Sequence, residues 1–437
     1  MRIAVIGTGH VGVPTCVALS HIGHHVVGTD LDQEKIGGLQ QGIPPFFEPG
    51  LPEALVTELR SGRLRFASSS GEAIPESEVL FLCVATEPES DGRANLDALE
   101  RAARDVARFA TGDPVVVEKS TVPSGTSERL RRMLADSGRE IDLEVVSNPE
   151  FLRQGSALRD ALDPERILIG ADSARGFEVM RRVYDPLISR GHRVIETDVR
   201  TAELAKYACN SFLALKISYA NALASLCERM GLDVGVVTEV MGADTRIGGA
   251  FLSPGLGFGG SCLPKDLVAF ELLASDHGYE FPLLREIRAL NEEALFSVLR
   301  KVEDATGGMK GKRICLLGLS YKPNTDDVRG SPAIELARRL MAGGAEVVGY
   351  DPQAMPNAKS EMGSLELASD PYEASSAADC LVICTEWSEF AHIDLERMKR
   401  EMRSPVVVDA RMVLNPDDVR RARVEYYPTG SPPSIPS

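Results

Sequence analysis

The chain has 437 residues, 43% hydrophobic and 26% charged, so it is long enough for two or three folded domains and lacks the composition of a disordered protein. A net charge of −16 without any Lys/Arg-rich block argues against nucleic acid as a partner, and no apolar run approaches the roughly 20 residues of a membrane span. Eight cysteines with no CxxC pair predict neither a metal site nor a disulfide framework, and they favour the cytoplasm; the opening "MRIAVIGTGH" lacks a signal-peptide core and indicates a strand.

The first 150 residues alternate between apolar, β-branched runs and helix-like segments. Strands are expected at 2–7, 25–30, 79–86, 114–121 and 143–150, with helices between the first two and at 95–109 and 126–136. This alternation is typical of a parallel, doubly wound sheet.

From about residue 198 a stretch of some thirty residues without proline or interior glycine predicts one long helix that ends near Gly231. Strand-like runs return at 312–320, 345–351, 380–387 and 405–411. We therefore expect an α/β chain with two Rossmann-like doubly wound domains joined by a long central helix. The expected domains are 1–197, 198–300 and 310–437, with a Pro/Ser-rich tail that is disordered from about 428.

The segment "GTGHVG" follows the first expected strand and opens a helix, and Asp30 ends the second strand. Gly7, Gly9 and Gly12 permit a tight turn and close approach of a pyrophosphate to the helix N-terminus. The Asp30 carboxylate accepts hydrogen bonds from ribose hydroxyls and repels a 2′-phosphate. The pattern predicts NAD rather than NADP, against the alternative of glycine turns in another α/β protein. The second such unit, which contains Gly318, lacks the other two glycines and resembles a dinucleotide fold without a dinucleotide.

The segment "GFGGSCLPKD" places Cys262 before Pro264, which can occupy the first turn of a helix, with Lys265 nearby. A helix N-terminus and a cation both favour a thiolate, and Asp266 is spaced to reach the sulfur or an attacking water. Spacing alone leaves open a small, buried, inert cysteine.

Lys206 and Asn210 lie four residues apart on one face of the expected long helix. The lysine is spaced to stabilise an oxyanion there, although a lone lysine more often extends to solvent, and the sequence alone leaves both alternatives open.

Seven segments in order resemble the UDP-glucose/GDP-mannose dehydrogenase family, from residue 1 to about 415. They are "GTGHVG", "EPGL" (48–51), "KSTVPSGT" (119–126), "NPEFLRQGSALRD" (148–160), "ELAKYACNSFLALKIS" (203–218), "GFGGSCLPKD" (257–266) and "GLSYKPNTDDVRGSP" (318–332). The resemblance implies an NAD-dependent, four-electron oxidation of a nucleotide-sugar primary alcohol to a carboxylate, with two NAD and one water. It also implies a homodimer built on the long helix, an NAD-binding N-terminal domain, and a C-terminal domain for the nucleotide sugar.

The resemblance implies a thiohemiacetal and then a thioester on Cys262. Lys206 and Asn210 would hold oxyanions, and the remaining residues would position water and transfer protons. The implied catalytic set is Cys262, Lys206, Asn210, Asp266, Glu150 and Thr121.

The same resemblance implies two sets of binding residues. The NAD set is Gly7, Gly9, Val11, Gly12, Asp30, Lys35, Thr86, Thr121, Glu150, Lys265 and Arg329. The substrate set is Phe151, Leu152, Arg153, Lys206, Asn210, Arg246, Phe251, Leu252, Ser253, Gly255, Gly259 and Lys322, with Arg246 supplied by either this subunit or its partner.

Within this resemblance, the segment 148–160 is most similar to the UDP-glucose branch, which implies UDP-glucose as substrate. Leu263 also occurs in the GDP-mannose branch and leaves GDP-mannose as the first alternative, followed by UDP-N-acetylmannosamine and dTDP-glucose. His10, Gln154 and Glu87 depart from the family pattern at the rim of the expected sites and weaken the case for one sugar. A non-catalytic NAD or nucleotide-sugar sensor is the alternative from another class, but such a protein has no chemical need for the complete catalytic set.

Overall fold

The computed structural model describes residues 1–136 and 143–435, which divide into two compact units. The first contains residues 1–209 and 268–279, and the second contains 210–267 together with the chain from 280 onward. Each unit is built around one mainly parallel sheet, as expected from the alternating sequence pattern.

The first unit has eight strands in the order β3-β2-β1-β4-β5-β6-β7-β8. All pair in parallel except β6 with β7. The strands are β1 (Arg2–Ile6), β2 (His25–Thr29), β3 (Leu64–Ala67), β4 (Val79–Leu82), β5 (Val115–Glu118), β6 (Val145–Ser147), β7 (Ile167–Gly170) and β8 (Val194–Thr197).

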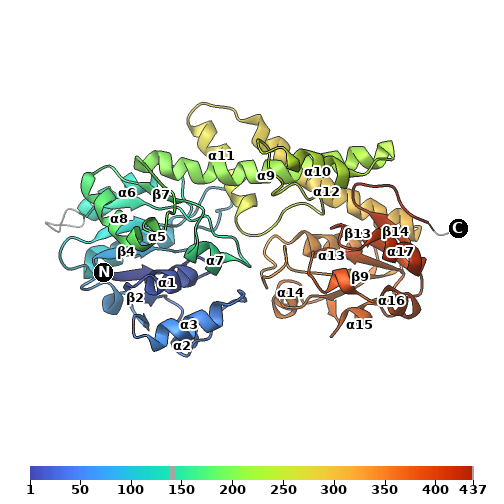
Figure 1. Cartoon of the computed structure of the whole chain (residues 1–437), viewed down its shortest axis with the longest axis horizontal. Coiled ribbons are helices and arrows are strands. Elements are labelled where there is room, and N and C mark those ends of the chain that lie inside the picture. Colours follow the sequence, from blue (N-terminus) through green and yellow to red (C-terminus); the bar gives the residue numbers. More distant parts are fainter. Residues whose placement is uncertain (137–142, 436–437) are drawn as a thin grey trace. The chain divides into compact units, whose positions relative to one another are not determined.

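Helices cover both faces of this sheet (Figure 1). Successive residues of β1 point to opposite faces and those from Ile3 to Ile6 are all buried, so both faces must be covered. Ile3 and Val5 pack into one apolar core, whereas Ala4 and Ile6 pack into another on the opposite face. The helices are α1 (Gly12–His21), α2 (Gln33–Gln40), α3 (Leu51–Arg60), α4 (Ser70–Ala73), α5 (Asp97–Phe109), α6 (Thr126–Ala135), α7 (Ala157–Leu162) and α8 (Ala174–Ile188).

The second unit has six parallel strands in the order β11-β10-β9-β12-β13-β14. They are β9 (Arg313–Leu317), β10 (Glu346–Tyr350), β11 (Glu366–Leu367), β12 (Cys380–Ile383), β13 (Val406–Asp409) and β14 (Glu425–Pro428). The accompanying helices are α10 (Val234–Ala243), α12 (Pro282–Thr306), α13 (Pro332–Ala342), α14 (Met355–Glu361), α15 (Pro371–Ser375), the short 3₁₀ helix η1 (Phe390–His392), α16 (Leu395–Glu401) and α17 (Pro416–Ala422).

The expected long helix is α9 (Val199–Met230), 32 residues drawn in green in Figure 1. It ends as predicted, because Gly231 adopts a positive φ of 70° and the N–H of Leu232 returns to the carbonyl of Cys227 at 2.8 Å. Helix α11 (Leu263–Asp276) begins directly after Cys262. The α/β fold with two Rossmann-like sheets and a long central helix is confirmed.

The tail differs from the expected disorder over residues 428–435. Strand β14 ends at Pro428, and Ser434 pairs with Tyr426 through two backbone hydrogen bonds. Gly430 is held from both sides, because its N–H donates to Glu228 at 2.6 Å and its carbonyl accepts the N–H of Val234 at 2.9 Å. These backbone hydrogen bonds offset the chain entropy that the Pro/Ser-rich composition suggested would dominate.

Candidate active site

The glycine turn after β1 has the shape that a dinucleotide needs. Gly7 has a φ of 95°, and a Cβ there would lie 2.6 Å from the Cys83 carbonyl oxygen. A Cβ on Gly12 would lie 1.9 Å from the Gly7 carbonyl oxygen, so both glycines are required by packing within the turn. A Cβ on Gly9 would instead meet nothing within 4 Å, which leaves open space beside the N-terminus of α1, where Val11 is the N-cap residue. This cradle fits a pyrophosphate.

Asp30 lies just after β2 with a side chain that is 16% exposed. Its Oδ2 accepts the N–H and hydroxyl of Thr8 at 2.8 and 3.0 Å, and its Oδ1 accepts the N–H of Asp32 at 3.2 Å. Burial alone would raise the pKa of this carboxyl, but these donors and the Lys35 ammonium, 3.3 Å away, hold the pKa below its ordinary value. Asp30 is therefore a carboxylate with Oδ1 only weakly engaged, which suits ribose hydroxyls, and Lys35 lies against it.

Thr86 and Thr121 follow the ends of β4 and β5. The Thr86 hydroxyl donates to the Thr121 carbonyl at 2.9 Å, which joins the two loops at the carboxyl edge of the sheet. Parallel sheets bind ligands at this edge, so the position of both residues agrees with the expected cofactor role.

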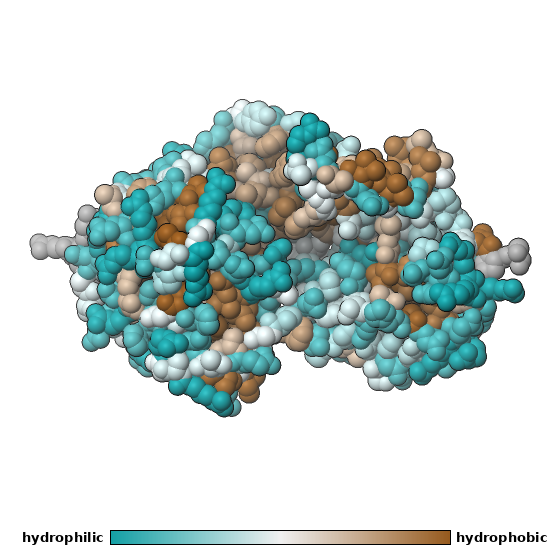
Figure 2. Space-filling view, viewed as in Figure 1, coloured by the Kyte–Doolittle hydropathy of each residue, from teal (hydrophilic) through white to brown (hydrophobic). Residues whose placement is uncertain are grey.

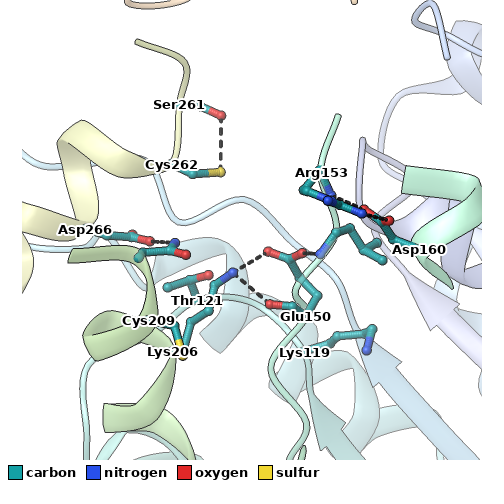
Figure 3. Close-up of polar contacts among 12 residues, drawn as sticks. Lys119, Thr121, Glu150, Arg153, Asp160, Lys206, Cys209, Ser261, Cys262 and Asp266 are labelled. Carbon is teal, nitrogen blue, oxygen red and sulfur yellow. Dashed lines mark hydrogen bonds and ion pairs between the residues drawn. The ribbon is translucent and has the colours of Figure 1, made fainter. Parts of the chain in front are cut away.

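Lys206 and Glu150 form a buried ion pair (Figure 3). The Lys206 Nζ donates to Glu150 Oε1 at 2.9 Å and to the Glu150 carbonyl at 2.7 Å, and the two side chains are 5% and 7% exposed. Glu150 Oε2 accepts the N–H of Leu152. The alternative that Lys206 extends to solvent is wrong. A cation held in such a low-dielectric setting can stabilise a developing oxyanion strongly.

Cys262 is the N-cap residue of α11, because its carbonyl accepts the N–H of Asp266 at 3.0 Å. Its side chain is exposed, with Ser261 Oγ 3.8 Å from the sulfur, so the alternative of a buried filler is wrong. The first-turn amides of α11 provide the positive field that favours a thiolate at this position.

Asp266 is 1% exposed and uses both oxygens, one of them in the contact drawn as a dashed line in Figure 3. Oδ2 accepts Asn210 Nδ2 at 2.6 Å, and Oδ1 accepts Lys265 Nζ at 2.8 Å. The pair orients the Asn210 amide, one helical turn beyond Lys206 on α9. Lys265, expected to contact NAD, pairs with Asp266 here.

The expected substrate residues of the first unit lie around Phe151. The Arg166 guanidinium lies 3.8 Å and the Lys206 ammonium 5.3 Å from the centroid of this ring, and Leu152 follows it. Arg153 pairs with Asp160 through Nε at 2.9 Å and Nη2 at 2.6 Å.

The expected residues of the second unit are partly engaged by the protein itself. The Gly255 N–H donates to Asn221 Oδ1 at 2.7 Å, and a Cβ on Gly259 would lie 2.2 Å from the Gly330 carbonyl oxygen, so that glycine is required by packing. The others are Phe251 (φ 64°), buried Leu252, exposed Ser253, Lys322 above the Tyr321 ring, Arg246 paired with Asp244, and Arg329 paired with Asp327.

Sequence reasoning missed the residues that hold the cysteine loop, among them Asn221 on α9 and Asn291 on α12. Asparagine is unfavourable inside a helix, because its side chain competes for backbone hydrogen bonds. Two asparagines within otherwise strong helical segments were therefore a usable signal that those side chains bond to a neighbouring backbone.

Within the described ranges 1–136 and 143–435, no helix is both long and apolar enough to cross a membrane. No group of three or more His, Cys, Asp or Glu side chains in those ranges is arranged to hold a metal ion.

Three models of one family match consecutive parts of the chain. They are the NAD binding domain (residues 1–188), the central domain (200–293) and the UDP binding domain (315–416) of the UDP-glucose/GDP-mannose dehydrogenase family. The chain belongs to the UDP-glucose/GDP-mannose dehydrogenase family.

Individual relatives match over the full length. The chain is 44% identical over 436 residues to the UDP-glucose 6-dehydrogenase of Rhizobium meliloti, covering 99% of this chain and 100% of the relative. Among solved structures it is similar to a UDP-glucose dehydrogenase from Pyrobaculum islandicum, with 40% identity, a TM-score of 0.92 and coverage of 98% and 97%. A UDP-D-ManNAc dehydrogenase from Pyrococcus horikoshii has 28% identity, a TM-score of 0.87 and coverage of 98% and 99%.

Family membership and the cradle at Gly9 agree on the cofactor, which is NAD. The UDP binding domain of the family makes a nucleotide sugar the substrate class. The chain is thus an oxidoreductase of nucleotide-sugar metabolism.

Proposed function

We propose that this chain is a UDP-glucose 6-dehydrogenase that converts UDP-glucose to UDP-glucuronate. One structural observation carries the proposal: an exposed cysteine caps α11 beside a buried Asp266–Asn210 pair, as covalent aldehyde chemistry requires. Identity of 44% to a UDP-glucose 6-dehydrogenase, against 28% to a UDP-D-ManNAc dehydrogenase, supports UDP-glucose over the related sugar.

In the proposed mechanism the C6 hydroxyl first loses its proton and the C6 carbon loses a hydride, which gives an aldehyde. The Cys262 sulfur then adds to this aldehyde, forming a C–S bond while the carbonyl oxygen becomes an oxyanion. Loss of hydride from this thiohemiacetal leaves a thioester, which water cleaves to the carboxylate with release of the thiolate. NAD, when bound, supplies the hydride acceptor for each of the two oxidations. The cysteine keeps the aldehyde attached throughout, which a serine, a weaker nucleophile near neutral pH, would do poorly.

The surrounding side chains have separate tasks in this scheme. Lys206 and Asn210 hold oxyanions, the first as a cation and the second as an amide donor oriented by Asp266. Glu150 and Thr121 position the hydrolytic water, and Asp266 takes part in proton transfer.

The expected NAD and substrate residues are part of this proposal. Asp30 accepts hydrogen bonds from ribose hydroxyls and the Gly9 turn receives the pyrophosphate. Arg329 is assigned to the cofactor and Lys322 to the sugar nucleotide. We assign NAD binding to 1–197, dimerisation and the cysteine loop to 198–300, and nucleotide-sugar binding to 310–437, which is supported by the order of the three family domains.

A homodimer in the cytoplasm completes the proposal. Phe212, Tyr219 and Leu226 recur every seven residues on α9 and are 61%, 50% and 50% exposed, and Val236 and Val240 of α10 are also exposed. Figure 2 shows apolar surface over this region. Such a helical stripe favours a second copy as its partner, and Arg246, 87% exposed, is then available to a partner's substrate site. All eight cysteines lie in described residues without disulfide bonds, which supports a reducing compartment.

The decisive assay follows NADH with purified protein, NAD and, separately, UDP-glucose, GDP-mannose, dTDP-glucose and UDP-N-acetylmannosamine. We expect two NADH for each UDP-glucose consumed and no turnover by Cys262→Ser, which should still bind NAD. Turnover with only one of the other sugars would replace UDP-glucose as the assigned substrate. NADH formation by the serine variant would overturn the covalent scheme. No NADH with any sugar would favour a binding protein.

A further inference from the structure

The loop before Cys262 changes abruptly from buried to exposed. Residues 254–260 are all buried, whereas Cys262 is exposed. The loop is rich in glycine, and Gly257 and Gly260 have positive φ of 100° and 82°. A glycine-rich segment has little stiffness of its own, so the position of Cys262 depends on what holds this loop.

Asn291 of α12 holds the loop at two points. Its Oδ1 accepts the N–H of Phe258 at 2.7 Å, and its Nδ2 donates to the carbonyl of the same residue at 3.0 Å. One amide thus satisfies both backbone groups of Phe258, as a neighbouring strand would, and restrains the two peptide units on either side of this residue.

The loop also fits closely around Asn291. A Cβ on Gly257 would lie 2.7 Å from Asn291 Oδ1 and 3.0 Å from the Asn291 carbonyl oxygen. The positive φ of Gly257 and the absence of its side chain therefore allow the contact, which explains a glycine at this position independently of any ligand.

Two other side chains hold the loop less completely. Asn221 accepts the Gly255 N–H at 2.7 Å, and Arg411 Nη2 reaches the Gly257 carbonyl at 3.5 Å. Asn291 binds nearest to the cysteine, four residues before it, and is the one of these three that fixes both a donor and an acceptor of a single residue.

We propose that Asn291 is a positioning residue for Cys262: its two-point hold on Phe258 fixes the sulfur at the N-terminus of α11. This rests on the proposed role of Cys262 as nucleophile. Loss of the hold lets the sulfur move away from the helix N-terminal amides, which makes the thiol harder to ionise and misaligns its attack.

The test compares Asn291→Ala and Asn291→Asp with Glu292→Ala, a control at the next position of α12 where the side chain is 63% exposed. Iodoacetamide alkylation of Cys262 is followed by peptide mass spectrometry across pH, with Cys262→Ser as background. Turnover, KM for NAD and unfolding midpoints are measured on the same full-length samples.

For Asn291→Ala we expect the alkylation midpoint to move to higher pH and kcat to fall roughly 100-fold, with KM for NAD unchanged. Asn291→Asp should lose at least as much, because its anionic oxygen faces the Phe258 carbonyl. The control should match the parent protein. A normal alkylation profile in both Asn291 variants, even with a lower unfolding midpoint, would overturn the inference, whereas turnover by Cys262→Ser would overturn the proposed function instead.

Discussion

Asp30 and Asp351 occupy the same topological position in the two sheets, directly after the strand that neighbours the first strand. The glycines after those first strands also correspond, since Gly7 and Gly318 each donate an N–H at 2.8 Å to the end of the neighbouring strand. The side chains differ in what they bind. Asp30 is partly exposed and uses Oδ1 weakly, whereas Asp351 is 1% exposed.

Asp351 is saturated by the protein. Oδ2 accepts the N–H groups of Leu319 and Ser320, the Ser320 hydroxyl and Trp387 Nε1, all at 2.8 to 3.1 Å, and Oδ1 accepts two further backbone N–H groups at 2.8 and 2.9 Å. The same carboxylate position thus keeps unused acceptor capacity in one sheet and serves the fold in the other. The strand, the turn and the acid are therefore not enough for a dinucleotide site. The carboxylate must also be accessible to the ligand and have an oxygen free to accept a hydrogen bond.

The largest expected effect comes from removing the saturated acid. Asp351→Ala should lower the free energy of unfolding by at least about 3 kcal/mol, because it leaves several buried donors without an acceptor. Asp30→Ala should cost far less. Urea unfolding of both variants tests this ranking, and a larger loss for Asp30→Ala would show that the assignment of ligand and structural roles is reversed.

Gly318 of the second sheet and Gly9 of the first differ in the space around them. A Cβ on Gly318 would lie 2.4 Å from Thr385 Cβ at a φ of 91°, so Gly318→Ala should destabilise the chain by about 1–3 kcal/mol. Gly9→Ala meets open space, so it should fold normally and bind NAD more weakly. Thermal unfolding with NAD titration separates the two outcomes; tight NAD binding by Gly9→Ala would mean that the pyrophosphate lies elsewhere.

Asp30→Ala should weaken NAD binding by roughly 10- to 100-fold, the effect of losing a charge-assisted hydrogen-bond acceptor. It should also relax rejection of NADP, because the carboxylate no longer repels a 2′-phosphate. Fluorescence titration with both nucleotides measures this directly. Unchanged affinity for NAD would remove Asp30 from the cofactor site.

The sequence predicted the structure well wherever that structure depends on local spacing. Gly7, Gly9, Gly12 and Asp30 lie within one strand-turn-helix-strand unit, and the turn after Gly318 lacks the later glycines of that pattern.

Contacts between residues far apart in the chain could not be predicted from local spacing. Asn291 reaches Phe258 across 33 residues, and Arg411 reaches Gly257 across 154. The tail pairs with β14 through backbone groups, which carry no side-chain pattern. Local composition predicted disorder there, and tertiary hydrogen bonds prevailed.

The smallest expected effect concerns a second equivalent pair, Glu118 at the end of β5 and Asp409 at the end of β13. Asp409 accepts the N–H groups of Val413 and Leu414 at 2.9 Å, whereas neither carboxylate oxygen of Glu118 has a hydrogen-bond partner among the described residues. Burial, and then the nearby Glu203 carboxylate, raise the pKa of Glu118 well above its ordinary value.

A raised folded-state pKa means that the folded chain holds a proton that the unfolded chain releases. The stability that Glu118 contributes is therefore full below its ordinary pKa and is lost as pH rises through the raised value. Glu118→Gln should remove this loss, so its advantage over the parent protein in unfolding midpoint should grow from pH 5 to pH 9. Asp409→Asn, which weakens acceptance of backbone N–H groups, should lower the midpoint at pH 7. A Glu118→Gln midpoint that tracks the parent across this range would show that Glu118 is ionised in the folded chain and has found a partner, making the two acids alike after all.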